Sequence, residues 1–549
     1  MYVVDWLHKQ ALRHPDKPAL VDSVSGRARS FREVDERASR FAELVRDRWR
    51  LAPGARVAVL AGNSTDYLEM LYGCAKAGVV MACLNWRLPA AELAPIVEDA
   101  QPGAFVCGEE YTAVAGAVLA GRAPLPGLVV RGVAGAAGAE SGAPSLAPGS
   151  AAAAAMAVRE GGAHAPGGGP DGAWPDYESA LAASSGRVVE MPCPTMEAPW
   201  YLLYTSGTTG RPKGVIQTYG MAFFNAVHAM LATRLSGDDV LLAALPFFHT
   251  GGLNLYANPI LFAGGTVVVM RQFDAGEALR WLCTGITQFV GVPTQYLLIA
   301  QHPGFAASRF AKMRHWSAGG SPMPRALLET WAAKGVTICF GFGMTETGPT
   351  VFLPDEAAAR AKPGSVGKPV GTMLTRVVDA QGRDCAAHQR GELLVKGPGV
   401  TPGYWNNAEA TRAALRDGWL HTGDVAYFDD DGDYWIVDRL KDMFISGGEN
   451  VYPAEIENLL YQMPQVAEAA VIGVRDAKWG EVGLAAIVLR SGAVLDAVQV
   501  RAFCRERLAG YKVPRHVRFV AALPRTPAGK VEKPSLRQRF DSALPGEDS

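Results

Sequence analysis

The chain has 549 residues, of which 49% are hydrophobic and 19% charged, and its formal net charge is −1 at pH 7. This length exceeds what one compact core normally holds, so at least two domains are expected. The balanced charge provides no basic field for nucleic acid or for an anionic membrane surface. No run of about 18 uncharged apolar residues occurs, so no stable membrane span is expected.

The amino-terminal segment and the cysteines favour a cytoplasmic enzyme. Residues 1–10 lack a basic region followed by an apolar core, so export is not indicated. The 8 cysteines are scattered along the chain without any C-x-x-C spacing. This distribution favours reduced thiols over disulfides or a zinc site.

Residues 1–107 alternate helical and strand patterns, and residues 223–300 repeat the alternation. The individual elements follow from apolar residues at helical spacing or in short buried runs. Helices are expected at 31–45, 67–77 and 275–283, and strands at 57–61, 240–244 and 265–270. Such alternation favours a doubly wound, largely parallel sheet, so the predicted fold class is α/β.

Two later segments differ from this pattern. Residues from about 131 to 172 are rich in Ala and Gly and offer few large apolar side chains. They cannot offset their ordering entropy and are expected to form a flexible surface insertion. After a turn at 429–433 and a strand at 434–437, short strands are expected at 469–474 and 484–489, with helices starting at 451 and spanning 501–508. This last part predicts a compact α+β domain of about 110 residues.

A glycine-rich loop follows the apolar segment 200–204, which is predicted to be a short strand. With its flanks the loop runs Tyr204-Thr-Ser-Gly-Thr-Thr-Gly-Arg-Pro-Lys-Gly-Val215. Glycines let backbone N–H groups approach an anion, and the hydroxyls and Lys213 add donors and positive charge, so the loop suits a polyphosphate. It is not the P-loop of nucleotide triphosphatases, because Pro212 stands where the second glycine is required and Gly214 follows the lysine.

Four more motifs follow the loop. They are Gly341-Phe-Gly-Met-Thr-Glu-Thr347, Trp419-Leu-His-Thr-Gly-Asp424, Asp438-Arg-Leu-Lys-Asp-Met443 with Ile445-Ser-Gly-Gly-Glu-Asn-Val451, and Pro524-Arg-Thr-Pro-Ala-Gly-Lys530. In type and order, the five motifs resemble the signatures of adenylate-forming enzymes, which include acyl- and aryl-CoA synthetases, luciferases and peptide-synthetase adenylation domains. The hexapeptide 438–443 is close to the linker of fatty acyl-CoA synthetases.

The resemblance implies a domain organisation. Residues 1–437 would form a large N-terminal domain of doubly wound α/β subdomains with a small β-barrel-like subdomain. Residues 438–443 would be the hinge. Residues 444–549 would form a smaller, mobile α+β domain that acts as the AMP-binding lid.

The same resemblance implies the nucleotide site. Contacts to the β- and γ-phosphates are assigned to Thr205, Ser206, Gly207, Thr208, Thr209, Gly210 and Lys213, and contacts to adenine and the α-phosphate to Gly341, Phe342, Gly343, Met344 and Thr345. Within this set, Phe342 would stack on adenine and Thr345 would donate to the α-phosphate. Glu346 is a catalytic candidate and, together with Thr208, the candidate magnesium ligand, since a hard cation prefers oxygen ligands. Asp424 would accept both ribose hydroxyls, and Arg439 would contact the ribose from the hinge side.

The C-terminal motifs are assigned to the two half-reactions. Lys530 would bridge the substrate carboxylate and the α-phosphate, a role that suits a compact charge on a long side chain. Lys441 would be the pivot about which the C-terminal domain rotates after adenylation. Gly447, Gly448 and Glu449 would then line a channel for the pantetheine arm of CoA.

The acid pocket is assigned to the segment Pro246-Phe-Phe-His-Thr-Gly-Gly252 and to small residues elsewhere. His249 would lie beside the entering carboxylate and is a catalytic candidate. The pocket walls are assigned to Phe248, Leu253, Gly319, Gly320 and Gly341, with a further wall from 291–296. Some long-chain members carry a gating Trp shortly after the His, where this chain has Leu253 and Asn254.

The resemblance therefore implies an ATP-dependent acid–CoA ligase that uses Mg²⁺ and forms first an acyl-AMP and then an acyl-CoA. A medium- or long-chain fatty acid is the expected substrate. The alternatives are an aryl or alicyclic acid, an adenylating enzyme that loads a carrier protein, and a non-catalytic sensor of acyl-AMP or CoA. The expected partners are the carboxylic acid, ATP and CoA, without nucleic acid, and a homodimer is the assembly considered.

Overall fold

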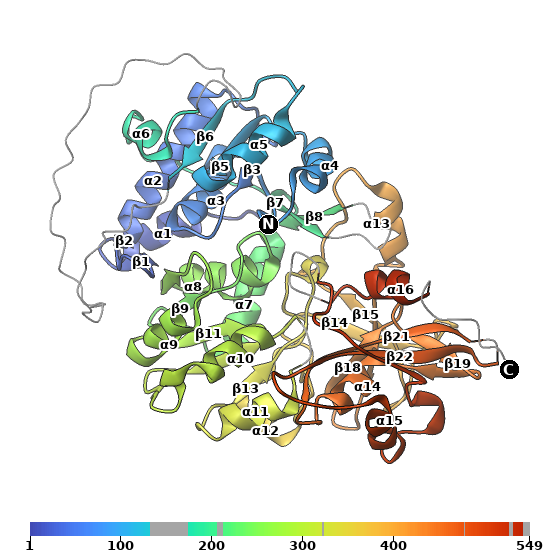
Figure 1. Cartoon of the computed structure of the whole chain (residues 1–549). Helices are drawn as coiled ribbons and strands as arrows, with labels where there is room; N and C mark the ends of the chain where they lie inside the picture. The colour runs from blue at the N-terminus through green and yellow to red at the C-terminus, as the bar shows by residue number, and fades with distance from the viewer. Residues whose placement is uncertain (132–173, 206–211, 321–322, 477, 526–530, 542–549) are drawn as a thin grey trace.

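The computed structural model describes residues 1–131, 174–205, 212–320, 323–476, 478–525 and 531–541. They form two large, mainly parallel sheets with helices, a small antiparallel sheet, and a separate C-terminal α+β unit (Figure 1). The predicted insertion at 131–172 lies, apart from residue 131, outside the described residues. Among the described helices, none combines the length and the apolar character that crossing a membrane requires.

The first large sheet has six strands in the order β6-β5-β3-β4-β7-β8. Its strands are β3 (Arg56–Leu60), β4 (Val80–Cys83), β5 (Ala104–Gly108), β6 (Gly127–Val130), β7 (Pro199–Thr205) and β8 (Lys213–Thr218). All neighbours are parallel except β7 and β8, which form an antiparallel pair with Thr205 opposite Lys213. The helices associated with this sheet are α3 (Thr65–Ala77), α4 (Ala90–Ala100), α5 (Thr112–Leu119) and α6 (Tyr177–Ala182).

The second large sheet has seven strands in the order β13-β12-β11-β9-β10-β1-β2. They are β1 (Pro18–Asp22), β2 (Ala28–Ser30), β9 (Val240–Ala243), β10 (Thr266–Val269), β11 (Gln288–Gly291), β12 (His315–Ala318) and β13 (Ile338–Phe340). The associated helices are α1 (Trp6–Arg13), α2 (Phe31–Glu43), α7 (Tyr219–Thr233), α8 (Asn258–Ala263), α9 (Ala275–Thr284), α10 (Pro293–Gln301), α11 (Arg325–Ala332) and α12 (Glu356–Ala361). Only the β1–β2 pair is antiparallel. Together the two sheets confirm the predicted doubly wound α/β fold.

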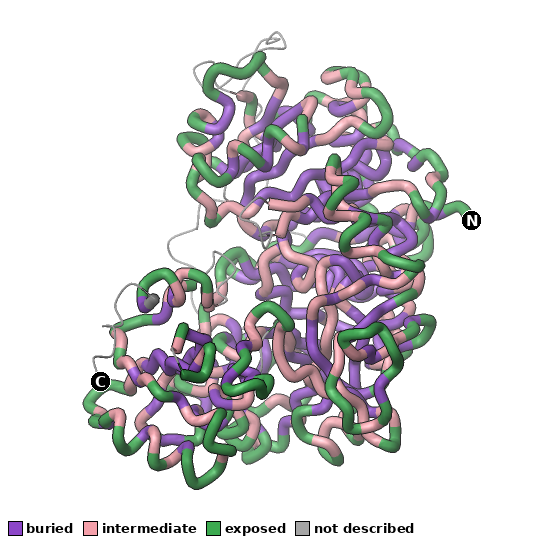
Figure 2. Tube along the Cα trace, turned by 90° about the vertical axis from the view of Figure 1, so that its right-hand side faces the viewer, coloured by how far each residue is buried: buried purple, intermediate pink, exposed green. Residues whose placement is uncertain are grey.

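The core lies between and around these sheets. Alternate residues of one strand point to opposite faces, so Val57 of β3 joins a cluster between the sheets whereas Ala58 joins a cluster on the outer face. Leu241 and Leu242 of β9 divide in the same way. Strands that are buried on both faces are typical of parallel sheets and explain their continuous apolar runs. Figure 2 shows this buried interior in purple beneath a largely exposed surface.

Local signals set the helix ends. In α3, the Ser64 side chain accepts a hydrogen bond from the Tyr67 N–H, and Gly78 ends the helix in a left-handed conformation with φ +72°. In α9, Asp274 caps the helix by accepting from the Glu277 N–H at 2.7 Å. Polar caps and a terminal glycine satisfy backbone groups that the helix itself leaves without partners.

The small β subdomain follows the second sheet. It contains β14 (Leu374–Val378), β15 (Gly391–Lys396), β16 (Leu415–Arg416), β17 (Trp419–Phe428) and β18 (Tyr434–Arg439), with α13 (Ala408–Ala414). The strands pair antiparallel in the order β14-β15-β17-β16, and β18 also pairs with β17. Their inner side chains form a separate cluster that includes Phe352, Leu393 and Tyr434.

The C-terminal unit has its own sheet and cores, as expected for a second domain. Its elements are β19 (Phe444–Ser446), β20 (Glu449–Val451), α14 (Pro453–Leu460), β21 (Val466–Asp476), β22 (Gly480–Leu489), α15 (Ala497–Arg505), β23 (His516–Phe519) and α16 (Lys533–Asp541). Helices α14 and α15 pack on one face through Ile456 and Val500, and α16 covers the other through Leu536.

Several element boundaries differ from the sequence-based expectation, and the largest shift is in the helix expected at 501–508, which is α15 at Ala497–Arg505. The hinge expected at 438–443 begins inside β18, because Arg439 pairs with Asp424 across the β17–β18 ladder. The helix expected from residue 451 starts two residues later, because Val451 ends β20 and Pro453 occupies the first helical turn. Proline favours that position, where its missing N–H costs nothing.

Candidate active site

The flanks of the phosphate loop, the acid-pocket segments and the 341–347 motif lie at one edge of the second sheet and on the adjoining hairpin β7–β8. In a parallel sheet the carboxyl ends of the strands meet at one edge, which is where α/β folds bind ligands. The segments that leave the carboxyl ends of β9, β12 and β13 carry Phe248–His249, Gly319–Gly320 and Gly341–Thr347.

The antiparallel hairpin β7–β8 holds the flanks of the phosphate loop. Thr205 and Lys213 face each other where the two strands end, and the Thr205 hydroxyl lies 3.5 Å from the Lys213 carbonyl. The Lys213 ammonium lies 5.1 Å from the centre of the Tyr404 ring. The predicted phosphate contacts Ser206, Gly207, Thr208, Thr209 and Gly210 lie outside the described residues, and so does the predicted role of Thr208 as a metal ligand.

The segment after β13 folds back on itself in a tight turn. Phe342 bridges Phe352, with backbone hydrogen bonds of 3.0 Å from the Phe342 N–H to the Phe352 carbonyl and from the Phe352 N–H in return. The Phe342 ring is partly exposed, as a stacking surface must be. A Cβ added to Gly343 would lie 1.9 Å from the Pro349 carbonyl oxygen, so only glycine fits this turn.

Glu346 is buried and held from two sides. The Tyr404 hydroxyl donates to its Oε1 at 2.9 Å, and the Thr401 N–H donates to its carbonyl at 2.8 Å. Burial, followed by the Glu346 charge, raises the pKa of the Tyr404 phenol well above its usual value, so the phenol stays a donor. A buried carboxylate beside the phosphate-loop flank fits a hard divalent cation, since one oxygen is oriented by Tyr404.

Tyr404 is a candidate site residue that the sequence motifs did not predict. It bridges Val215 of β8 through an isolated β-pair and lies between Lys213 and Glu346. The available signal was the run Pro402-Gly403-Tyr404-Trp405, a rigid turn with two aromatic residues that matches no chemical motif. Only the fold brings it to the site.

The predicted ribose residues are directly paired. Asp424 and Arg439 face each other on β17 and β18, and Arg439 Nε lies 2.6 Å from Asp424 Oδ1. The Asp424 side chain is only 4% exposed whereas the Arg439 side chain is 41% exposed. The carboxylate is therefore held in place while the guanidinium remains open to a ligand.

Contacts in the hinge segment alternate between the two domains. The Leu440 N–H donates to the Gly423 carbonyl at 2.8 Å, which ties residue 440 to the small β subdomain. Asp438 Oδ2 accepts from the Ala454 N–H of α14 at 2.8 Å, and Arg537 of α16 donates to the Asp442 carbonyl at 3.3 Å. Lys441, the predicted pivot, is exposed between these attachments.

The loop assigned to CoA is the turn of the β19–β20 hairpin. Gly447 and Gly448 have φ of +60° and +88°, which favours glycine, and both are exposed together with Glu449. A Cβ added to Gly447 would lie 2.7 Å from the Trp479 ring, so that ring packs directly against the turn. Lys530 lies outside the described residues.

The residues assigned to the acid pocket combine aromatic rings and glycines. The rings of Phe248 and His249 are 4.5 Å apart, and Trp86 meets Phe248 edge to face at 6.0 Å. Phe248 and Leu253 are buried, whereas a Cβ added to Gly319 would meet only the Gly341 carbonyl at 3.4 Å, leaving open space. Gly320 has φ +84°. Trp86, which lies far away in the sequence, was not predicted to belong to this group.

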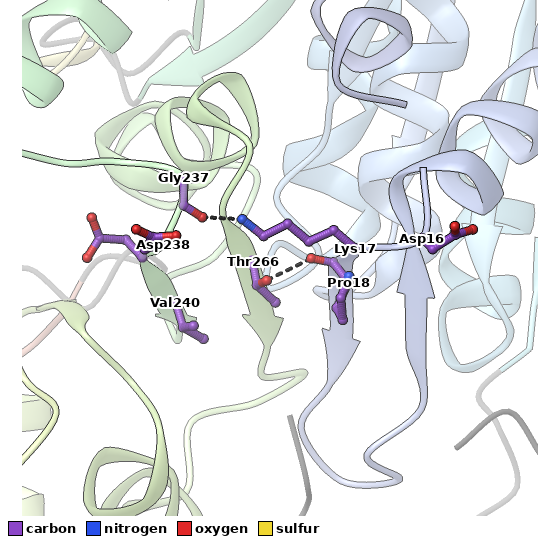
Figure 3. A pocket seen from close by; sticks show the side chains of 8 residues that line it. Asp16, Lys17, Pro18, Gly237, Asp238, Val240 and Thr266 are labelled. Carbon is purple, nitrogen blue, oxygen red and sulfur yellow. Dashed lines mark hydrogen bonds between the residues drawn. The ribbon is translucent and has the colours of Figure 1, made fainter. Parts of the chain in front are cut away.

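A separate cavity of about 490 Å³ lies at the opposite edge of the second sheet. Figure 3 shows it at the amino-terminal ends of β1, β9 and β10, where Lys17 donates to the Gly237 carbonyl. The Thr266 hydroxyl donates to the Pro18 carbonyl at 2.7 Å in the same place. Burial lowers the pKa of the Lys17 ammonium. None of the motif residues lines this cavity, so it is not the predicted site.

A second carboxylate group also lies away from the motifs. Asp429, Asp431 and Asp433 surround the Lys362 ammonium at 2.6, 2.7 and 2.8 Å. The lysine occupies the position that a cation would take and joins α12 to the β17–β18 turn. We therefore assign these carboxylates a structural role.

Comparison with known proteins gives three kinds of match. The sequence family described as AMP-binding enzyme matches residues 7–405, and its C-terminal domain matches residues 455–530. A feruloyl-CoA synthase from Amycolatopsis sp is 37% identical over 97% of this chain and 96% of the relative. A long-chain-fatty-acid–CoA ligase from Mycobacterium tuberculosis is 35% identical over 99% of both chains. The solved structure of o-succinylbenzoate CoA synthetase from Bacillus subtilis, in complex with its acyl-adenylate intermediate, has a TM-score of 0.81 and 29% identity, and the match covers 100% of both chains.

Glu346→Gln keeps the shape and the Tyr404 hydrogen bond but removes the charge. We expect magnesium-dependent ATP binding to weaken by about tenfold or more, because a hard cation prefers a carboxylate. Titration of ATP at several Mg²⁺ concentrations measures this. The matched control is Glu69→Gln, which alters a fully buried carboxylate paired with Arg29 and Arg37 and should lower stability without changing the Mg²⁺ dependence. Equal Mg²⁺ dependence in Glu346→Gln and the parent would contradict the assignment.

Proposed function

Because the chain belongs to the AMP-binding enzyme family, as an AMP-forming acid–thiol ligase, we propose that it joins an aromatic carboxylic acid to CoA. The observation that carries the aromatic choice is the ring group beside His249. Trp86 and Phe248 pack edge to face there, and the cation of Arg87 lies 4.9 Å from the Trp86 ring. Offset and edge-to-face contacts of this kind favour an aromatic guest. The similarity to a feruloyl-CoA synthase supports the same choice.

A medium- or long-chain fatty acid is the second candidate. Gly319 leaves space unfilled near the Gly341 carbonyl, and the buried Leu253 stands where a gating aromatic would close an acyl tunnel. The long-chain-fatty-acid–CoA ligase relative, matched over almost the whole chain, favours this reading. Both candidates use the same chemistry and differ only in the shape of the acid.

The first half-reaction forms the mixed anhydride. One carboxylate oxygen attacks the α-phosphorus, the bond to the β-phosphate oxygen breaks, and pyrophosphate leaves. Attack of one anion on another requires cations and donors at the point of approach. We assign this task to Lys213 on the leaving pyrophosphate, Thr345 on the α-phosphate and Lys530 between the carboxylate and the α-phosphate.

Bound magnesium would neutralise charge on the phosphate oxygens. Glu346 is the described residue that we propose to hold it, oriented by Tyr404. Phe342 would hold adenine, and Asp424 with Arg439 would hold the ribose at the mouth of the small β subdomain. These residues bind and orient the nucleotide.

The second half-reaction forms the thioester. The CoA thiolate attacks the acyl carbon, the carbon–oxygen bond breaks, and AMP leaves with the carboxylate oxygen. We propose that the C-terminal domain rotates about Lys441 between the two steps and brings the Gly447–Glu449 turn toward the acyl-adenylate. The exposed position of Lys441 between attachments to both domains supports a pivot there.

Thioester formation over a panel of acids tests the proposed substrate. The panel should contain ferulate, benzoate, indoleacetate, cyclohexanecarboxylate, octanoate, palmitate and acetate, each assayed with and without CoA. We expect CoA-dependent AMP release to be highest with an aromatic acid. Highest turnover with palmitate or octanoate would favour the second candidate. Adenylate trapped by hydroxylamine without any CoA-dependent thioester would indicate a carrier-protein acceptor, and no turnover at all would indicate a sensor.

Lys530→Ala separates the two half-reactions. We expect acid-dependent pyrophosphate release to fall by about a hundredfold or more, because the charge that joins carboxylate and α-phosphate is lost. The same variant given pre-made acyl-AMP and CoA should form thioester at close to the parent rate, since Lys530 would have rotated away. The control Lys312→Ala removes an exposed surface lysine and should change neither rate. Equal losses in both half-reactions would contradict the rotation.

A further inference from the structure

A chain of buried side-chain amides joins the acid-pocket segment around His249 to the 341–347 motif. Gln217 of β8 is fully buried, and its Nε2 donates to the Thr345 carbonyl at 2.9 Å. Its Oε1 accepts from Asn254 Nδ2 at 3.1 Å. Asn254 is 1% exposed and lies five residues after His249. Two amides therefore connect Thr345 to the segment that carries the predicted carboxylate contact.

Asn254 has all of its hydrogen-bonding capacity in use. Besides Gln217, its Nδ2 donates to the Thr250 hydroxyl at 3.1 Å. Its Oδ1 accepts from the Tyr201 hydroxyl and from Asn258 Nδ2, the latter at 3.3 Å. A side-chain amide has two N–H donors and an oxygen with two lone pairs, so this set fixes both its position and its orientation. The amide cannot turn without leaving a buried polar atom unsatisfied.

The backbone around Asn254 is also unusual. Residues Gly251–Ala257 form a π-helix, whose wider turn frequently occurs at functional sites. A Cβ added to Gly252 would lie 2.1 Å from the Pro246 carbonyl, so the helix packs tightly against the segment between β9 and His249. A displacement of this segment would therefore also displace the Asn254 side chain.

A second arm of hydrogen bonds leads from Asn254 through Asn225 to Thr350, just after the 341–347 motif. The Asn254 carbonyl accepts from Asn225 Nδ2, and Asn225 Oδ1 accepts from the Thr350 hydroxyl at 2.6 Å. Thr350 precedes the bridge between Phe342 and Phe352. Asn225 and Thr350 are each 1% exposed. The two arms hold the 341–347 motif at Thr345 and the residues just after it at Thr350.

We propose that Gln217 and Asn254 are positioning residues that couple acid binding at the 249–257 segment to the placement of Thr345 on the α-phosphate. The proposal rests on the proposed adenylation at this site. Attack on phosphorus requires the carboxylate and the α-phosphate to be aligned closely, and a misplacement of about 1 Å can cost a hundredfold in rate. The amide chain thus links the position of Thr345, which would contact the α-phosphate, to the segment that would hold the carboxylate.

Gln217→Met tests the link, because the Met side chain has a similar volume to Gln at this fully buried position but lacks its amide. We expect the dissociation constant of MgATP, measured by calorimetry without any acid, to rise by about fivefold or more, because the Thr345 carbonyl loses its donor. The control is Gln288→Met, which removes an equally buried glutamine at the amino end of β11 that donates to Asp239 at 3.2 Å. The control should lose thermal stability and keep the parent affinity for MgATP. Equal affinities in the parent and both variants would overturn the proposal.

Gln217→Glu adds a readout that a purely structural role would not produce. Above its pKa, which burial raises, the carboxylate accepts from Asn254 but repels the Thr345 carbonyl, whereas the protonated acid donates to that carbonyl. We therefore expect the affinity for MgATP, relative to the parent, to recover as the pH falls from about 8.5 to about 6. An affinity ratio that stays constant or worsens as the pH falls would contradict the link.

The kinetic test uses the double variant. Gln217→Met and Asn254→Leu act on one chain, so their effects on acid-dependent pyrophosphate release should be strongly non-additive, with the double variant close to the worse single one. Additive effects would overturn the coupling. MgATP binding needs neither an acid nor turnover, so a parent protein that binds MgATP but shows no CoA-dependent turnover would defeat the proposed function and leave the coupling measurable.

Discussion

Repulsion between a carboxylate and a triphosphate is the constraint around which the described site is organised. We propose that Lys213, at the start of β8, provides positive charge on one side and that the buried Glu346 provides an oxygen ligand on the other. Tyr404 lies between them, with its ring beneath the ammonium and its hydroxyl on the carboxylate. Because burial keeps the phenol protonated, Tyr404 orients the Glu346 carboxylate without adding a charge of its own.

The fold supports this arrangement by bringing distant segments to one edge. Parallel strands align their carboxyl ends, so the segments after β9, β12 and β13 meet although nearly a hundred residues separate the first from the last. The small β subdomain adds the Asp424–Arg439 pair next to the hinge. Since Leu440 is tied to one domain and Asp438 and Asp442 to the other, the proposed rotation would redistribute the hydrogen bonds of the hinge segment.

Much of this could be predicted from the sequence, because periodicity and turn residues are local signals. The strand at 57–61 and the helix at 67–77 are confirmed with ends shifted by one to two residues, and the α+β C-terminal unit is confirmed with ends shifted by up to four residues. The remaining features depend on tertiary contacts. Nothing near Tyr404 indicates that its hydroxyl meets Glu346, and Gln217, inside an apolar strand, gives no sign that it supports Thr345. Such partners become visible only when β8 is placed beside the motif.

The central claim is that one site activates a carboxylate as its adenylate, and the fate of a carboxylate oxygen tests it most directly. The acid that turns over is labelled with a heavy oxygen isotope in its carboxyl group and converted with ATP and CoA. Because thiolate attack breaks the bond between the acyl carbon and the bridging oxygen, the account predicts one labelled oxygen in each AMP released. Label in inorganic phosphate, with unlabelled nucleotide, would mean that an acyl phosphate forms instead and would contradict the account.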